Sequence, residues 1–154
     1  MTIRRSAAAA SAVALGLFAL SACSKPTPLA TVTVGKGTVN TEATCYNNGK
    51  PLTAEILQSC LSKQPTHTVK VRQTDTIHLG VEPAMAKNGW LIIGNSMQKT
   101  NLIKDTYRSF SGQSLFIDQT TGQPTSSVVM NIVESAGDNS SALGVWKFKM
   151  ELQS

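Results

Sequence analysis

Three cysteines are the residues of this 154-residue chain most suited to covalent chemistry, and the first of them ends an apolar N-terminal segment. Arg4 and Arg5 open the segment, the uncharged stretch Ala7–Leu20 follows, and Ser21-Ala22 precedes Cys23. Positive charge, a short apolar stretch and small residues in this order are typical of a secretory signal. The four residues ending in Cys23 also match a lipobox, the bacterial signal for cleavage just before a cysteine that bears a diacylglyceryl group. The sequence therefore predicts lipid attachment at Cys23.

This predicted anchor sets the expected compartment. A membrane-spanning helix needs about 20 apolar residues, and the stretch before Cys23 is shorter, so residues 1–22 are interpreted as a cleaved signal peptide. The two acyl chains of the anchor are sufficient for stable membrane attachment. Residues 23–29 are expected to form a short tether and residues 30–154 a single domain on the extracytoplasmic face of the cell membrane. The alternative to the lipobox is an ordinary signal peptide with a coincidental cysteine. The alternative to the general secretory route is export by the twin-arginine route.

Cys45 and Cys60 remain as a pair once Cys23 is assigned to the lipid. Outside the cytoplasm a disulfide bond persists, so the sequence predicts a bridge between these two residues. Closing a loop of this length contributes about 3 kcal/mol in the chain-entropy model. Two reduced, buried thiols are the alternative. A redox-active pair is disfavoured because the chain has no Cys-x-x-Cys motif.

The charge of the chain disfavours nucleic acid as a partner. The formal net charge is +5, from 14 Lys and Arg residues against 9 Asp and Glu. Loss of Arg4 and Arg5 with the signal peptide lowers it to +3. The remaining basic residues are scattered, without the cluster that nucleic acids or anionic lipids attract.

Alternation of apolar and polar residues predicts an all-β fold after the tether. The predicted strands are 30–35, 38–46, 66–72, 76–81, 90–94, 97–102, 107–110, 126–134 and 143–152. About seven to nine short strands with turns every 8–12 residues favour an immunoglobulin-like β-sandwich. The bridge between strands on either side of a tryptophan, common in that fold, is absent because both cysteines precede Trp90.

One segment, 53–61, has a helical pattern, and Thr53 is its predicted N-cap. Ile56, Leu57, Cys60 and Leu61 share one face of this helix, so Cys60 is expected to point inward. The bridge would then fasten the helix to the strand that contains Cys45.

The last predicted strand alternates clearly. Trp146, Phe148 and Met150 are expected to face the core, with Lys147 and Lys149 on the opposite side. The polar stretch 111–127 is interpreted as a long loop with one anchoring turn at 115–117.

Four blocks of residues carry a resemblance to known proteins. They are CSKPTPLATVTVG from Cys23, CYNNGK from Cys45, TIHLGVEP from Thr76 and GVWKF from Gly144. Together they resemble a family of small actinobacterial lipoproteins catalogued only as a domain of unknown function. The resemblance covers essentially the whole mature chain. It implies a Gram-positive envelope, with retention on the outer face of the cytoplasmic membrane, and it implies no activity, ligand or catalytic residue.

Catalytic and metal-binding patterns are weak. His67 and His78, the only histidines, are interpreted as solvated strand residues. A blue-copper site requires two His, a Cys and a Met, and the late Cys, His and Met cluster of such proteins is missing. A Cu(I) site of His78 with Met85 or Met97 is a minor alternative. No Gly-x-Ser-x-Gly motif occurs and nothing singles out a pair of acids, so no catalytic residue, metal or cofactor is predicted.

The possible binding residues are Tyr46, Tyr107 and Phe110, together with the loop 111–127, because loops on a rigid sandwich are common binding sites. The expected function is that of a non-enzymatic, lipid-anchored envelope protein of binding or structural type. Its expected partner is another envelope protein or a cell-wall component. A lipoprotein that delivers a small ligand or metal to a membrane transporter is the alternative. A wall hydrolase is the weakest hypothesis, since it would need two acids that converge in a cleft.

Overall fold

The structure is a computed structural model, and it describes residues 26–118, 120–137 and 141–153. The predicted signal peptide 1–22 and the predicted lipid attachment at Cys23 lie outside the described residues. Within these residues, no helix has the length and apolar character needed to cross a membrane.

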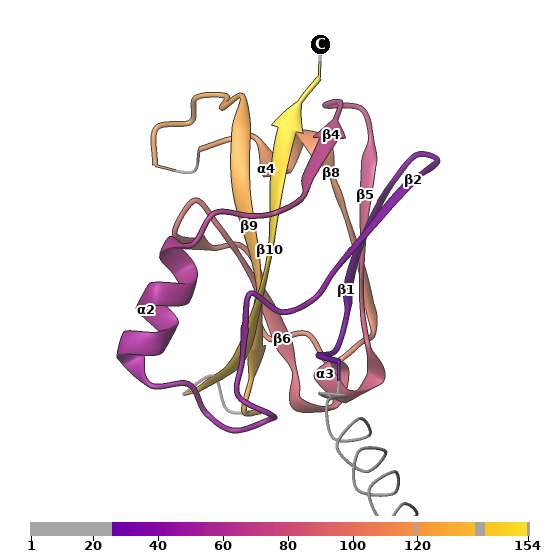
Figure 1. Cartoon of the computed structure of the whole chain (residues 1–154). Coiled ribbons are helices and arrows are strands. Elements are labelled where there is room, and N and C mark those ends of the chain that lie inside the picture. The colour runs from indigo at the N-terminus through magenta and orange to yellow at the C-terminus, as the bar shows by residue number, and fades with distance from the viewer. Residues whose placement is uncertain (1–25, 119, 138–140, 154) are drawn as a thin grey trace, which may run out of the picture.

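Two β-sheets form the domain (Figure 1). Sheet A has the order β2-β1-β5-β8, built from β1 (Ala30–Val34), β2 (Gly37–Thr41), β5 (Thr76–Val81) and β8 (Tyr107–Ser111). Sheet B has the order β3-β10-β9-β6-β7, with β4 also paired to β10. Its strands are β3 (Cys45–Tyr46), β4 (Thr68–Val71), β6 (Trp90–Gly94), β7 (Met97–Gln98), β9 (Ser127–Ser135) and β10 (Ala142–Leu152). Neighbouring strands are antiparallel except for the parallel pair β4 and β10.

The predicted all-β sandwich is confirmed. Strands β5 and β8 are neighbours in one sheet and β6, β9 and β10 in the other, which is the placement of strands B, E and C, F, G in immunoglobulin-like sandwiches. The described residues contain ten strands, one more than the upper predicted number. The extra strand arises because the predicted strand 38–46 is two: β2 belongs to sheet A and β3 to sheet B. The chain crosses between the sheets at residues 42–44, where Thr44 N donates to Val145 O (2.7 Å).

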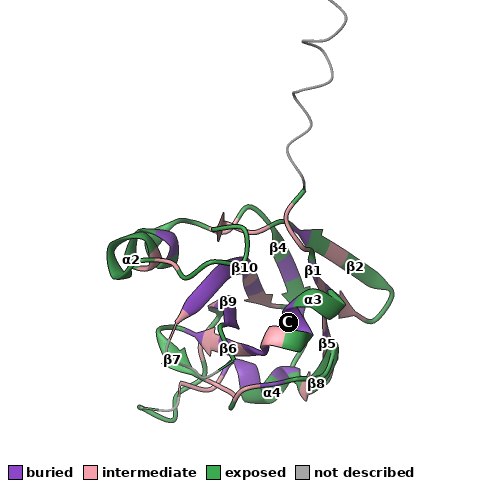
Figure 2. Ribbon diagram, turned by 90° about the horizontal axis from the view of Figure 1, so that it is seen from below, coloured by how far each residue is buried: buried purple, intermediate pink, exposed green. Residues whose placement is uncertain are grey.

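The core lies between the sheets, as the purple ribbon segments in Figure 2 show. Both tryptophans are fully buried there, as predicted. Each indole N–H is paired: Trp90 Nε1 donates to Asp105 O (2.8 Å) and Trp146 Nε1 to Pro28 O (2.7 Å). Buried indole groups need such partners, so these two bonds position the chain segments that supply the carbonyls.

The last three residues of the predicted tether are bound to the domain. Thr27 Oγ1 accepts from Ala43 N (3.0 Å), Pro28 O accepts from Trp146, and Leu29 N donates to Glu82 Oε1 (3.0 Å). Glu82 precedes the short helix α3 (Pro83–Asn88). The described chain therefore enters the domain at the α3 end of the sandwich (Figure 1).

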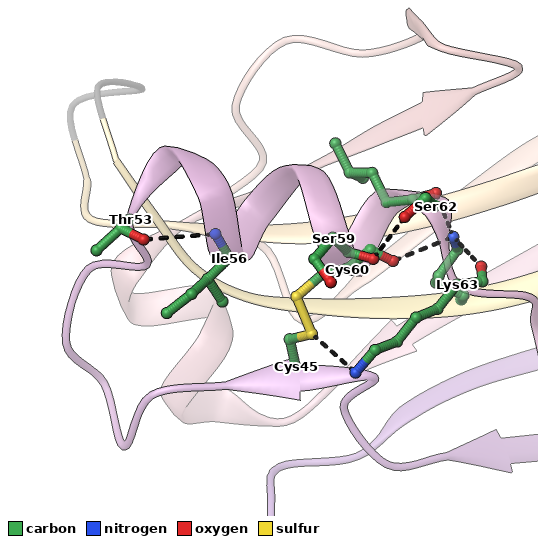
Figure 3. The surroundings of a disulfide bond; sticks show 9 residues. Cys45, Thr53, Ile56, Ser59, Cys60, Ser62 and Lys63 are labelled. Atoms are coloured by element: carbon green, nitrogen blue, oxygen red, sulfur yellow. Dashed lines mark hydrogen bonds between the residues drawn. A yellow bond between two sulfur atoms is a disulfide. The ribbon is translucent and has the colours of Figure 1, made fainter.

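The predicted helix is α2 (Ala54–Ser62), and Thr53 caps it, because its side chain accepts from Ile56 N (3.4 Å). Cys60 is buried and bonded to Cys45 of β3, as Figure 3 shows. The predicted inward face is wrong at two positions: Ile56 is 46% exposed and Leu61 37% exposed. The helix lies on the outer side of sheet B (Figure 2), where only a narrow stripe of it is covered.

Lys147 is buried rather than solvent-exposed, although it does point away from the core as predicted. It is 2% exposed. Its Nζ donates to the carbonyl oxygens of Cys60 (3.3 Å), Leu61 (2.6 Å) and Lys63, at the C-terminal end of α2. A cation there complements the negative end of the helix dipole and satisfies carbonyls that lack helical partners. Burial lowers the pKa of Lys147.

The loop 111–127 contains the short helix α4 (Gly112–Leu115). Leu115 and Phe116 are buried, which confirms the predicted anchoring turn. The predicted strand 97–102 is reduced to the two residues of β7.

Removing the bridge is expected to destabilise the fold. A variant with Cys45→Ala and Cys60→Ala should lose about 3 kcal/mol in the free energy of unfolding, because its unfolded chain regains the entropy of an open loop. Urea denaturation of the two proteins measures the difference. Reductant should lower the stability of the wild type and leave the double variant unchanged. Equal stability of the two proteins without reductant would contradict the prediction.

Candidate functional site

The three predicted binding residues do not form one surface. Tyr46 lies on β3 in sheet B, half-buried, with its ring centroid 5.9 Å from that of Trp146. Tyr107 and Phe110 lie on β8, the edge strand of sheet A. Tyr46 is thus part of the packing beside Trp146, and β8 carries the other two residues.

Strand β8 presents two different surfaces because successive side chains alternate. Arg108 and Phe110 pair in register with the buried Leu79 and Ile77, so they face the sheet-B side. Tyr107 and Ser109 face outward with Gly80 and His78. The predicted pair of residues on β8 is therefore split between the two sides of the sheet.

A cluster of three side chains occupies the outward side. The ring of Tyr107 is stacked on that of His78 (centroids 5.6 Å apart, planes 18° apart), and Tyr107 remains 52% exposed. His78 Nδ1 is hydrogen-bonded with the Tyr107 hydroxyl and lies 3.1 Å from Ser109 Oγ. Ser109 Oγ in turn donates to Tyr107 Oη (2.9 Å). Sequence reasoning missed this cluster, because the pairing of β5 with β8 has no local sequence signal.

The cluster is part of a larger surface, which we call the outer face of sheet A. Its members are Thr31, Thr33, Thr38, Asn40, Thr76, His78, Gly80, Tyr107, Ser109 and Ser111. Neighbours are hydrogen-bonded across strands: Thr31 Oγ1 donates to Asn40 Oδ1 (2.9 Å), and the hydroxyls of Thr33 and Thr38 are 3.0 Å apart. The four strands of sheet A contain one residue among Asp, Glu, Lys and Arg, namely Arg108, and it faces the other way. The outer face is therefore polar without formal charge.

The contact of Ser109 with His78 has the spacing of a nucleophile and a base. A catalytic base is normally oriented by a third group, as in the serine–histidine–acid triad. Within the described residues, His78 has no hydrogen bond to a carboxylate, and its Nδ1 is shared by two hydroxyls. The geometry fits a polar contact surface better than a nucleophilic site.

Among the described residues, no group of three His, Cys, Asp or Glu side chains is placed to hold a metal ion. The copper alternative is not formed: His78 lies on the outer face of sheet A, Met85 in the core and Met97 on β7 of sheet B. His67, the other histidine, is exposed before β4, as predicted.

A partly open cavity of about 230 Å³ lies on the other side of β8. Phe110 lines it, together with Ile92 and Leu115. Arg108 and Lys99 are also among its lining residues. The predicted binding residue Phe110 thus belongs to a cavity, whereas Tyr107 belongs to a flat surface.

Comparisons with protein-family models, curated proteins and solved structures find no match to this chain. The resemblance to small actinobacterial lipoproteins therefore stays a prediction from the sequence.

Glu134 is a buried acid away from both surfaces. It is 1% exposed, its Oε1 accepts from Asn88 Nδ2 (2.8 Å), and its Oε2 has no hydrogen-bond partner among the described residues. Burial raises the pKa of the Glu134 carboxyl, against a smaller opposing effect of the Asn88 hydrogen bond. The charged form is therefore costly in the folded protein.

This cost predicts a pH-dependent loss of stability. Because the pKa of Glu134 is raised in the folded protein, this residue contributes most favourably to the free energy of unfolding below the ordinary carboxyl pKa of about 4.3. The contribution declines as the pH rises through the folded-state pKa. Glu134→Gln keeps an acceptor for Asn88 and cannot ionise. Relative to wild type, the variant should therefore gain stability as the pH rises from about 4 to 7.

Urea midpoints of the two proteins across this pH range measure the effect. Their difference removes the contributions of the other carboxyls, which both proteins share. Glu42→Gln, at an exposed position, is the control and should give no comparable trend. Parallel curves for wild type and the Glu134 variant would refute the assignment.

Proposed function

We propose that this protein is a lipid-anchored, non-enzymatic binding protein of the bacterial cell envelope that holds an uncharged wall polysaccharide on the outer face of sheet A. The observation that carries the proposal is the composition of that face. It combines an exposed tyrosine ring with hydroxyl, amide and imidazole groups and lacks formal charges.

The chemistry of the face suits sugars. A sugar ring offers hydroxyls that both donate and accept, and Thr, Ser, Asn and His side chains do the same. Its C–H faces are apolar and pack against an aromatic ring. Neutral groups also cost less to remove from water than charges do, so the absence of formal charge favours a neutral polymer over an acidic one.

The face is also preorganised. Tyr107 is held by stacking on His78 and by the hydroxyl of Ser109, and it remains 52% exposed. Fixing a side chain before binding reduces the entropy lost on association. The isolated contact between Ser109 and His78 supports positioning of Tyr107 rather than catalysis.

The proposed anchor keeps the domain close to the bilayer. Thr27 is already bonded to the domain, so three residues separate Cys23 from the fixed part of the chain. Even fully extended, this linker reaches on the order of 15 Å. The proposed ligand is therefore one that lies next to the membrane.

Substitution of Tyr107 tests the binding surface. Tyr107→Ala should lower co-sedimentation with protein-free Gram-positive cell walls by about tenfold, since one exposed aromatic anchor contributes most of the stacking area. Leu61→Ala, which trims an exposed apolar side chain on α2, is the matched control and should bind normally. Binding to a neutral polymer should also be nearly independent of salt.

Wild-type affinity in the Tyr107 variant, or binding abolished by moderate salt, would refute the polysaccharide assignment. A wild-type dimer that Tyr107→Ala disperses would instead identify a second copy of the chain as the occupant of the face, and would count against the proposal.

Replacing the proposed lipidated residue tests the anchor. Cys23→Ser removes the thiol that would accept the diacylglyceryl group, so the protein should accumulate uncleaved or be released from the membrane. Metabolic labelling with a radioactive fatty acid, followed by membrane fractionation, measures both effects. Unchanged labelling and membrane retention in the variant would contradict the lipobox assignment.

A further inference from the structure

The cavity beneath β8 has the features of a second binding site, distinct from the outer face of sheet A. We infer that it binds a small amphiphile with one negative charge, of the class of medium-chain or aromatic carboxylates. This inference does not depend on the proposed polysaccharide binding, because it concerns the opposite side of the strand.

The floor of the cavity is apolar and built from three elements. Ile92 of β6 and Leu115 of α4 are buried in the core, and Phe110 of β8 is half-buried against it. The cavity of about 230 Å³ is smaller than the roughly 300–1,000 Å³ usual for drug-sized ligands. A short hydrocarbon chain or a single aromatic ring suits this size, and covering the floor would remove apolar surface from water.

Two cations line the same cavity. Arg108 reaches it because β8 turns this side chain toward sheet B, and Lys99 approaches from the segment after β7. The stem of Lys99 crosses Gly94 closely: a Cβ at that glycine would lie 3.1 Å from Lys99 Cε. Glycine at position 94 therefore leaves room for the lysine to lie along the rim.

Neither cation forms a salt bridge within the described residues, where the ion pair present is Lys149 with Glu151. Hydrogen bonds from the amides of Thr121 (3.0 Å) and Thr120 (2.8 Å) to Oδ1 of Asp118 are the main cause that lowers the pKa of this carboxyl, and the charge of Lys99 adds a smaller effect without a salt bridge. A third cation, Lys104, lines an adjoining hollow and donates to Asn88 O (2.8 Å). Arg108 and Lys99 are thus available to an anion.

The combination specifies the ligand class. An apolar floor without charge would accept any small hydrophobe, and cations on an exposed polar surface would attract any anion. Here both occur in one cavity, and Thr100 and Ser114 are also among its lining residues. A guanidinium pairs with a carboxylate through two parallel hydrogen bonds, which would hold the head of the ligand at the rim while its apolar part covers Phe110.

Octanoate and 1-octanol are the probes, because they share a chain length and differ in charge. Residues 24–154 contain both sheets, the core and the disulfide, so this segment is the protein to titrate by ¹H–¹⁵N correlation spectroscopy. Octanoate should shift the amides of Ile92, Lys99 and Phe110 in a saturable manner, and 1-octanol should bind more weakly. Equal affinity for both probes, or shifts spread over the whole domain, would overturn the inference.

Three variants test the residues. Arg108→Gln should weaken octanoate binding about fivefold, the effect of one partly exposed charge pair, with little effect on 1-octanol. Lys50→Gln, which removes an exposed cation elsewhere, should bind octanoate as wild type does. Ser114→Phe should block both probes by filling the cavity. Unchanged octanoate affinity in either the Arg108 or the Ser114 variant would refute the site.

Discussion

Strand β10 is the constraint on which the rest of the structure depends. Trp146 on its inner side is fully buried, packs beside Tyr46 and fixes Pro28 through its indole N–H. Gly144 makes this packing possible, since a Cβ there would lie 2.7 Å from the ring of Trp146. On the outer side Lys147 holds the end of α2. Because successive side chains of β10 point to opposite sides of sheet B, this one strand contacts the core and the entering chain on one side and the disulfide-linked helix on the other.

The same alternation on β8 separates two kinds of surface. Tyr107 and Ser109 extend a neutral face, whereas Arg108 and Phe110 border a cavity with cations and an apolar floor. A shift of one residue in the pairing of β8 with β5 would exchange the two sets and bring Arg108 onto the neutral face. The buried partners Ile77 and Leu79 oppose such a shift, because it would expose Phe110. Core packing therefore maintains the chemical difference between the two surfaces.

Local features of the fold were predictable from the sequence, and features set by distant partners were not. The period of two located 76–81 as a strand, the short apolar run located 90–94, and the helical pattern with its N-cap located the helix. The division of 38–46 between two sheets depends on which strands lie beside it. The burial of Lys147 depends on α2, and the contact of His78 with Tyr107 depends on register. No local pattern encodes these long-range pairings, so the candidate surfaces emerged from the structure.

The proposed anchor gives these surfaces a common orientation. Thr27 and Pro28 are bonded at the α3 end of the sandwich, and β1 runs away from that end (Figure 1). With a lipid on Cys23, the α3 end would face the bilayer and the strands of sheet A would point outward from it. The neutral face would then stand beside polymers just above the membrane rather than against the headgroups. A side-facing surface of this kind suits lateral contact with a wall polymer better than insertion into lipid.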